Sequence, residues 1–318
     1  MKPIPIVIDT DPAISIFGAD VDDALAIFLA LNSDEIEVDG ITTVFGNTNV
    51  DATFRIANEI LSVAGRTNIP VYKGAYNATW LGVRTKAVQY LIDQIMEHPG
   101  EITLVTLAPL TNVATAFLLE PRLIENLKAI LMMGGLFFRS NSKVPFLQSE
   151  FNFSRDSRAT KMVLEKYIDT TIVGLDLTTQ VVFKDENFRA LQRANTPITK
   201  YITKHTKSWL ALNKLLMSGG FNPHDPIAIA YLLQKSLFKL VKGTVEVQVS
   251  KRKLQQNLGH KRYSNSLFSA IGTMLAKDGA LKVSTPPLDY RTHKIKICTK
   301  INENGFLNLL IERLSRKF

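Results

Sequence analysis

The stretch VIDTDPAISIFGADVDDALAI, residues 7–27, joins an apolar segment to an amphipathic one. The β-branched residues before Asp9 predict a buried strand, and the periodic apolar residues after Asp22 predict a helix. The junction between them carries Asp9, Asp11, Asp20, Asp22 and Asp23. A helix start explains one or two acids, which accept from free N–H groups and oppose the helix dipole. Five acids repel one another unless a cation lies among them, so the junction indicates a metal site.

The residue types around this junction favour calcium as the cation. Carboxylates with few histidines and no cysteine nearby are typical of a hard, oxygen-preferring ion. Calcium suits a site that mixes carboxylates with a backbone carbonyl better than magnesium does. The single cysteine, Cys298, excludes an internal disulfide and a thiolate zinc cluster, and it agrees with a reducing compartment.

Along the rest of the chain, β-rich runs alternate with helical ones. Predicted strands precede predicted helices in three pairs: 4–11 and 22–32, 36–47 and 51–65, 101–109 and 110–120. Further strands are expected within 127–135, 169–178, 243–250 and the first part of 293–314, and a helix packed on several sides within 224–238. The alternation predicts an α/β, Rossmann-like fold with a mostly parallel central sheet flanked by helices. Because neither a repeat nor a low-complexity linker interrupts it, we expect a single domain over residues 1–318.

Composition limits the kinds of partner. The chain has 318 residues, 46% of them hydrophobic, and a formal net charge of +9. Its most basic runs, 251–253 and 260–263, lack the aromatic and glycine pattern of RNA-binding sheets, so no nucleic-acid partner is expected. The apolar runs are shorter than the roughly 20 residues of a membrane span, and the early acidic residues differ from a signal peptide. We therefore expect no membrane contact and a cytoplasmic location.

Polar residues follow the predicted strands where an open parallel sheet collects its ligands, outside the carboxyl ends of the strands. The candidates after strands are Asp9, Asp11, Asn47 and the Gly134–Gly135 pair, and His224 and Asp225 open a predicted helix downstream. The fold and these positions together predict one polar site at this edge.

A series of short motifs carries a resemblance to a known family. DTDP, DDALAI, TTVFGN, LAPLTNVATA, MMGG, SEFN and HDPIAIA occur in this order over most of the chain. No single motif is specific, but the ordered series resembles the inosine-uridine preferring nucleoside hydrolase family. The resemblance implies a small-molecule nucleoside as partner, whose N-glycosidic bond water cleaves while a calcium ion holds the ribose. It also implies a homo-oligomer, a dimer or tetramer.

The resemblance also implies a role for individual residues. It assigns metal ligation to Asp11, Asp23, Asp225 and the main-chain carbonyl of Met133, and ribose binding to Asp22, Asn47, Glu150 and Asn152. It implies Asp11 as general base and His224 as the acid that protonates the leaving base. These residue types suit the chemistry, because carboxylates stabilise an oxocarbenium-like ribose and a metal ion lowers the pKa of a bound water.

Each assignment has a structural alternative when the residues are taken singly. A histidine at a helix start is more often a cap or core residue, and Asn47 after a glycine suits a turn. Glu150 and Asn152 suit surface positions at a strand end. We interpret Asn112 and Asp176 as structural residues.

The sequence departs from the family pattern at two places that bear on the site. Residues 13–21 are inserted between DTDP and the aspartate pair, so Asp20 belongs to an expanded loop that Gly18 allows to fold back. Val144 stands where family members commonly carry an asparagine for the 5′ end of the sugar, which leaves recognition of the 5′-hydroxyl open. Trp80 is a candidate stacking residue in a segment where many members have histidine.

Three functions from different classes fit the motifs. The first is a calcium-dependent ribonucleoside hydrolase. The second is a non-catalytic relative that binds a nucleoside or a 5′-modified riboside, which Val144 and the inserted loop favour. The third is a haloacid-dehalogenase-like phosphatase with Asp9 as nucleophile and magnesium as cofactor. The third leaves the Asp22–Asp23 pair unexplained. A mere binder does not need both a base, Asp11, and an acid, His224, so the sequence favours the hydrolase.

Overall fold

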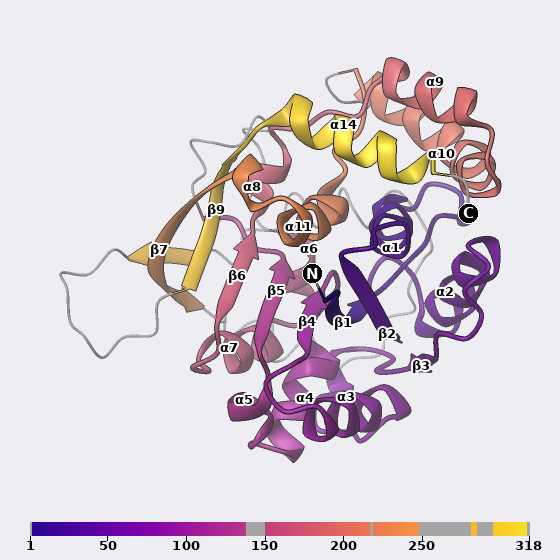
Figure 1. The fold of residues 1–318 in the computed structure, drawn as a ribbon. Coiled ribbons are helices and arrows are strands. Elements are labelled where there is room, and N and C mark those ends of the chain that lie inside the picture. Colours follow the sequence, from indigo (N-terminus) through magenta and orange to yellow (C-terminus); the bar gives the residue numbers. More distant parts are fainter. Residues whose placement is uncertain (1, 138–149, 217–218, 248–280, 285–294, 317–318) are drawn as a thin grey trace.

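The computed structural model describes residues 2–137, 150–216, 219–247, 281–284 and 295–316 (Figure 1). The strands are β1 Ile4–Thr10, β2 Ile36–Thr43, β3 Val71–Lys73, β4 Thr103–Thr106, β5 Ala129–Met133, β6 Thr170–Val173, β7 Phe238–Val247, β8 Leu281–Ser284 and β9 Ile295–Ile301. Among the described residues they form one nine-stranded sheet in the order β3-β2-β1-β4-β5-β6-β9-β7-β8. Strands β1 to β6 and β9 pair in parallel, whereas β7 runs antiparallel to β9 and β8. The predicted Rossmann-like, mostly parallel sheet is confirmed.

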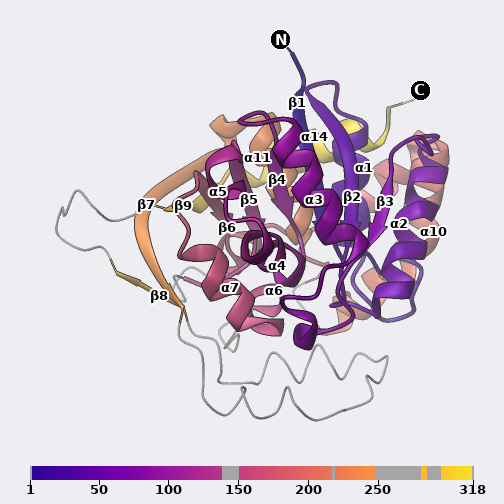
Figure 2. The same cartoon turned by 90° about the horizontal axis from the view of Figure 1, so that it is seen from below.

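Helices connect the strands and cover both faces of the sheet. They are α1 Asp22–Leu31, α2 Val50–Val63, η1 Ala78–Trp80, α3 Lys86–Glu97, α4 Thr111–Leu119, α5 Leu123–Asn126, α6 Phe151–Arg155, α7 Ser157–Leu164, α8 Leu175–Thr178, α9 Asp185–Ala194, α10 Pro197–Leu216, α11 His224–Leu233, η3 Lys235–Leu237 and α14 Glu303–Leu314. One apolar core lies between the sheet and α1, α2, α11 and α14, and a second lies between the sheet and α3, α4 and α7. Figure 2, seen from below, places α3, α4 and α7 in front of the strands.

Strand β1 lies at the point where the strand order reverses. The chain proceeds from β1 outward to β2 and β3, and then returns to β4 on the other side of β1. Ile6, Val7 and Ile8 are fully buried, as expected for a parallel strand covered on both faces. Reversal points of this kind open a crevice at the carboxyl ends of the strands, and Asp11 follows β1 there.

Helices α1 and α11, which begin at this crevice, are both buried in the core. All ten residues of α1 are buried, including Asp22 and Asp23 at its start. Helix α11 is buried from Asp225 to Tyr231, which confirms the expectation of a helix packed on several sides. The two helices pack against each other, so their amino-terminal acids are held close together.

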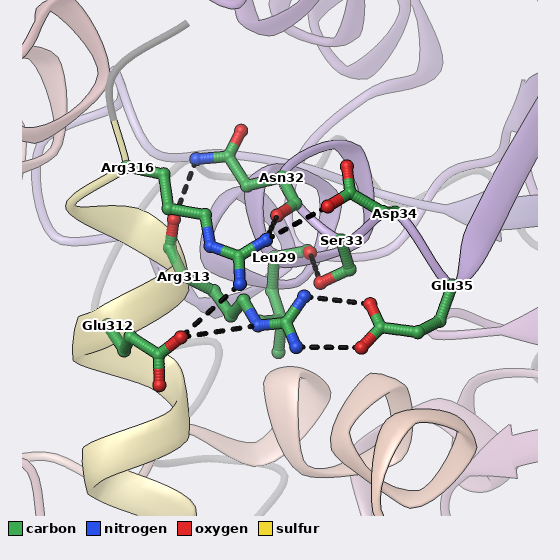
Figure 3. Close-up of polar contacts among 8 residues, drawn as sticks. All are labelled: Leu29, Asn32, Ser33, Asp34, Glu35, Glu312, Arg313 and Arg316. Carbon is green, nitrogen blue, oxygen red and sulfur yellow. Dashed lines mark hydrogen bonds and ion pairs between the residues drawn. The ribbon is translucent and has the colours of Figure 1, made fainter.

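Hydrogen bonds and ion pairs join the carboxyl end of α1 to the C-terminal helix α14 (Figure 3). Arg313 of α14 donates twice to the carboxylate of Glu35, at 2.7 Å each, and lowers the pKa of that carboxyl. Asn32, the C-cap residue of α1, donates through Nδ2 to the Arg313 carbonyl at 2.9 Å. Arg316 Nη1 lies 3.4 Å from Asp34 Oδ2. These contacts hold in place the carboxyl end of α1, the helix that carries Asp22 and Asp23 at its start.

Some sequence expectations concern parts of the chain outside this description. The basic runs at 251–253 and 260–263, the last residues of the predicted strand 243–250, and Val144 lie outside the described residues. The single-domain prediction for 1–318 stays a prediction. No described helix combines the length and the apolar character that crossing a bilayer requires.

Candidate active site

Three carboxylates from two helices meet at the crevice beside β1. Asp22 and Asp23 begin α1, Asp225 lies in the first turn of α11, and each offers an oxygen within 4.8 Å of the others. Their exposed fractions are 4%, 0% and 3%. The backbone N–H of Asp225 donates to Oδ2 of Asp22 at 3.2 Å, which joins the starts of the two helices. Residues more than 200 positions apart thus form one acidic cluster.

Asp11 joins this cluster through Asp23 and Asn47. Its backbone N–H donates to Oδ1 of Asp23 at 3.1 Å, and Thr10 Oγ1 donates to the same oxygen at 2.5 Å. Asn47 donates its backbone N–H to Oδ2 of Asp11 at 2.6 Å and its Nδ2 to Oδ2 of Asp23 at 3.0 Å. Asn47 is therefore a bridge between two carboxylates, and its predicted contact with ribose stays a prediction.

Burial and mutual repulsion raise the pKa values of these acids. Burial, reinforced by Asp23, raises the pKa of Asp11 well above its ordinary value. Burial, and then the neighbouring charge of Asp22, raises the pKa of Asp23 to about 7. Burial and the charge of Asp22 also raise the pKa of Asp225. Several carboxylates that repel one another out of water suit an oxygen-preferring cation, since such an ion would offset the repulsion.

The end of β5 and the start of α6 bring Met133, Glu150 and Asn152 together. The Met133 carbonyl accepts from Asn152 Nδ2 at 3.2 Å, and that same amide donates to the Leu107 carbonyl at 3.0 Å. Glu150 caps α6 and accepts backbone N–H groups from Asn152, Phe153 and Gly135 at 2.6, 2.9 and 2.9 Å. Because Glu150 and Asn152 are only 4% and 6% exposed at a helix start, the alternative of surface positions at a strand end is wrong.

The inserted loop, residues 13–21, folds back as expected. Gly18 takes a φ of 77°, a left-handed conformation that favours glycine, and Ile14 is 2% exposed in the core. Asp20 belongs to this loop, but its carboxyl lies beside Asp22, and burial raises its pKa to about 6. Asp20 therefore belongs to the inserted loop, as predicted, and also adjoins the acidic cluster.

Asp9 points away from this cluster into a structural network. Its Oδ1 accepts from Thr42 Oγ1 at 2.7 Å and from Asn112 Nδ2 at 2.8 Å, and its side chain is fully buried. Asn112 Nδ2 also donates to the Thr43 carbonyl at 3.1 Å, so the network joins β1, β2 and α4. The interpretation of Asn112 as structural is confirmed, and Asp9 is placed as a cross-link rather than as the nucleophile of a phosphatase.

His224 begins α11 beside Asp225 and is half-buried. Its Nδ1 lies 2.6 Å from Thr178 Oγ1, a contact across 46 positions of chain that no sequence motif indicated. Burial lowers the pKa of His224 to about 4, so the ring is mostly neutral near pH 7 and a proton that it takes up is released readily. Trp80 lies against Tyr76 with ring centres 4.8 Å apart and the ring planes tilted by 41°, and it packs beside the end of β2. Its contact with a nucleobase stays a prediction.

Comparison with known proteins decides the family of this chain. A family model described as inosine-uridine preferring nucleoside hydrolase matches residues 6–308. The chain belongs to this family. It is 33% identical over 273 residues to a probable uridine nucleosidase 2 of Arabidopsis thaliana, covering 77% of this chain and 82% of the relative. It is 30% identical over 275 residues to the inosine-uridine preferring nucleoside hydrolase of Leishmania major, covering 78% of this chain and 84% of that one.

Solved structures of nucleoside hydrolases share the fold. A plant nucleoside hydrolase, the PpNRh1 enzyme, superposes with a TM-score of 0.79 at 26% identity, covering 99% of this chain and all of that one. A purine-preferring ribonucleoside hydrolase from Gardnerella vaginalis gives the same TM-score at 21% identity, which shows the fold alone. The protein is thus an enzyme of the nucleoside hydrolase class, and the predicted resemblance is confirmed.

Proposed function

We propose that this nucleoside hydrolase cleaves the N-glycosidic bond of ribonucleosides with water, in a calcium-dependent reaction that yields ribose and free base. One observation carries the proposal: Asp22, Asp23 and Asp225 converge, buried, at the reversal point of the sheet, where the buried Asp11 donates its backbone N–H to Asp23. Relatives named for uridine or for inosine and uridine support ribonucleosides as substrates. We also expect a cytoplasmic homo-oligomer, a dimer or tetramer.

The residues at the crevice fit calcium. Asp11, Asp23 and Asp225 with the Met133 carbonyl would hold the ion, and Asp22, Asn47, Glu150 and Asn152 would hold the sugar. All of these residues offer carboxylate, carbonyl or amide oxygens as ligands. Among the described residues, the site offers neither cysteine nor a cluster of histidines. When bound, the ion supplies positive charge that orients sugar hydroxyls and favours ionisation of a water molecule.

The reaction needs two proton transfers, which Asp11 and His224 carry out. Asp11 takes a proton from the attacking water, whose oxygen bonds to the anomeric carbon as the carbon–nitrogen bond breaks. The leaving base nitrogen keeps the electron pair of that bond, and His224 delivers a proton to it. Positive charge that develops on the ribose is stabilised by the surrounding carboxylates. Water and nucleoside thus become ribose and neutral base, and the proton on Asp11 returns to solvent.

Release of ribose tests this function directly. Inosine, uridine, cytidine, adenosine and guanosine are incubated with the protein, with calcium and after chelation, and reducing sugar is measured. Calcium-dependent release from at least one nucleoside is the expected outcome. No release from any nucleoside, with calcium still bound by calorimetry, would instead favour a 5′-modified substrate or a non-catalytic binder.

Calcium should stabilise the protein more at high pH than at low pH. Burial and Asp22 raise the folded-state pKa of Asp23 to about 7 from an ordinary value near 4, so the protonated cluster favours folding below about pH 4. That contribution is lost as pH rises through about 7, where calcium can replace the protons. Thermal melts in calcium and in chelator at pH 5.5 and pH 8 measure this. An equal gain in Tm at both pH values would contradict a calcium site built from these carboxylates.

A further inference from the structure

The hydroxyl of Thr178 contacts the ring of His224. Its Oγ1 lies 2.6 Å from His224 Nδ1 and 3.3 Å from the Leu175 carbonyl, to which it donates. The Thr178 side chain is fully buried, so water does not compete for the hydroxyl. A hydroxyl whose own hydrogen lies on a carbonyl accepts from a ring N–H. With the hydroxyl hydrogen on the Leu175 carbonyl, the two contacts form a chain of hydrogen bonds, from Nδ1–H to Oγ1 and from Oγ1–H to that carbonyl. The reverse arrangement, in which the hydroxyl donates to Nδ1, requires the ring hydrogen on Nε2.

The backbone holds both ends of this contact. Helix α8, which carries Thr178, is tied to the end of β5 because Leu175 N–H donates to the Gly135 carbonyl at 2.8 Å. The segments that follow α8 and precede α11 form a β-bridge in which Phe183 and Phe221 exchange hydrogen bonds of 2.7 and 3.2 Å. The spacing between Thr178 and His224 is thus set by backbone pairing on both sides.

We propose that Thr178 is a positioning residue for the acid: it keeps the permanent hydrogen of His224 on Nδ1 and leaves Nε2 to deliver the proton. This inference rests on the proposed function, in which His224 protonates the leaving base. If the hydrogen lay instead on Nε2 of the neutral ring, Nδ1 would be the nitrogen left to take up a proton. Nδ1 faces Thr178, so a proton there would be out of reach of the base.

The step that Thr178 supports is a simple proton transfer. His224 takes a proton from solvent on Nε2 and gives it to the base nitrogen, which holds the electron pair of the broken carbon–nitrogen bond. The ring returns to its neutral form with hydrogen on Nδ1, still held by the Thr178 hydroxyl. Thr178 exchanges no proton itself.

The first test compares Thr178→Val with Thr178→Ser. Valine keeps the shape of threonine and removes the hydroxyl, so kcat for the best nucleoside of the panel should fall about 10- to 100-fold, a part of the contribution of general acid catalysis. KM should change little, because Thr178 touches His224 and not the sugar ligands. Serine keeps the hydroxyl and should restore most of kcat. A kcat for Thr178→Val within twofold of the wild type would overturn the inference.

The leaving group separates positioning from a general structural loss. p-Nitrophenyl riboside has a leaving group that needs no protonation, so Thr178→Val should hydrolyse it at nearly the wild-type rate. Thr170→Val is the matched control, because Thr170 is also buried and begins the strand that leads to α8. Within the described part of the chain, its hydroxyl donates to a backbone carbonyl at 3.1 Å. This control variant should leave both rates unchanged. Equal losses on both substrates for Thr178→Val would assign Thr178 to the scaffold and reject the inference.

A spectroscopic measurement distinguishes a failure of this inference from a failure of the proposed function. In 15N-histidine-labelled protein, with the His224 signals assigned by comparison with His224→Gln, long-range 1H–15N correlation reports which ring nitrogen bears hydrogen. Hydrogen on Nδ1 in the wild type, and its loss from Nδ1 in Thr178→Val, is expected. Hydrogen on Nε2 in the wild type would refute the role of Thr178. If His224→Ala slowed nucleosides and p-nitrophenyl riboside equally, the acid role itself would fail instead.

Discussion

Asp11→Asn should lower kcat for nucleoside hydrolysis by a factor of about a thousand or more, since loss of a general base alone typically costs 10²–10⁴-fold. The amide cannot take a proton from water, and it removes one negative charge from the group proposed to hold calcium. The amide also places hydrogen near the Asn47 N–H, which now donates to Asp11 Oδ2 at 2.6 Å. We expect weaker calcium binding together with the lost turnover, measured by calorimetry and initial rates.

The same substitution should stabilise the protein in chelator. Burial, with the charge of Asp23, raises the pKa of Asp11, so the ionised carboxylate opposes folding near neutral pH. A neutral amide removes that opposition, and Tm in chelator should rise although activity is lost. Asp93→Asn, on the exposed surface of α3, is the control and should alter neither property. Full activity of Asp11→Asn, or a fall in its Tm in chelator, would contradict this account of the site.

Gly46→Ala should lower kcat/KM about a hundredfold or more while leaving the core intact. A Cβ at this position would lie 1.7 Å from Asp11 Oδ2 and 2.8 Å from Asp11 Cγ, with Pro109 Cδ at 3.1 Å on another side. The carboxylate has to move, and a displacement of about 1 Å in a catalytic group costs on the order of 10²-fold. Steady-state kinetics and calcium titration measure both consequences.

Gly65→Ala is the matched control for this second prediction. Nothing lies within 4 Å of a Cβ at Gly65, but its φ of 66° strains any other residue. We expect it to cost about 1–2 kcal/mol in the free energy of unfolding and to leave kcat/KM unchanged. Wild-type kcat/KM in Gly46→Ala would show that a displaced Asp11 carboxylate still catalyses the reaction, and would contradict this prediction.

Much of the fold was predictable because strand and helix patterns are local. Each predicted strand from 4–11 to 169–178 contains an observed strand, and the apolar run at 224–238 contains α11. Local patterns do not encode pairing direction, so nothing in the sequence indicated that β7 would run antiparallel beside β9. The acidic residues after β1 were likewise apparent from spacing, since mutual repulsion makes such a cluster unusual without a cation.

By itself, the sequence determined the strand and helix pattern, the family motifs and the residue types of the site. Only the tertiary structure decided which of those residues meet. Asp22 receives the backbone N–H of Asp225, Gly46 lies against Asp11, and Thr178 holds the ring of His224. Each of these contacts joins positions separated by at least 35 residues of chain, and their distances depend on how buried helices pack against the sheet. That packing is a property of the whole core, so no short stretch of sequence contains it.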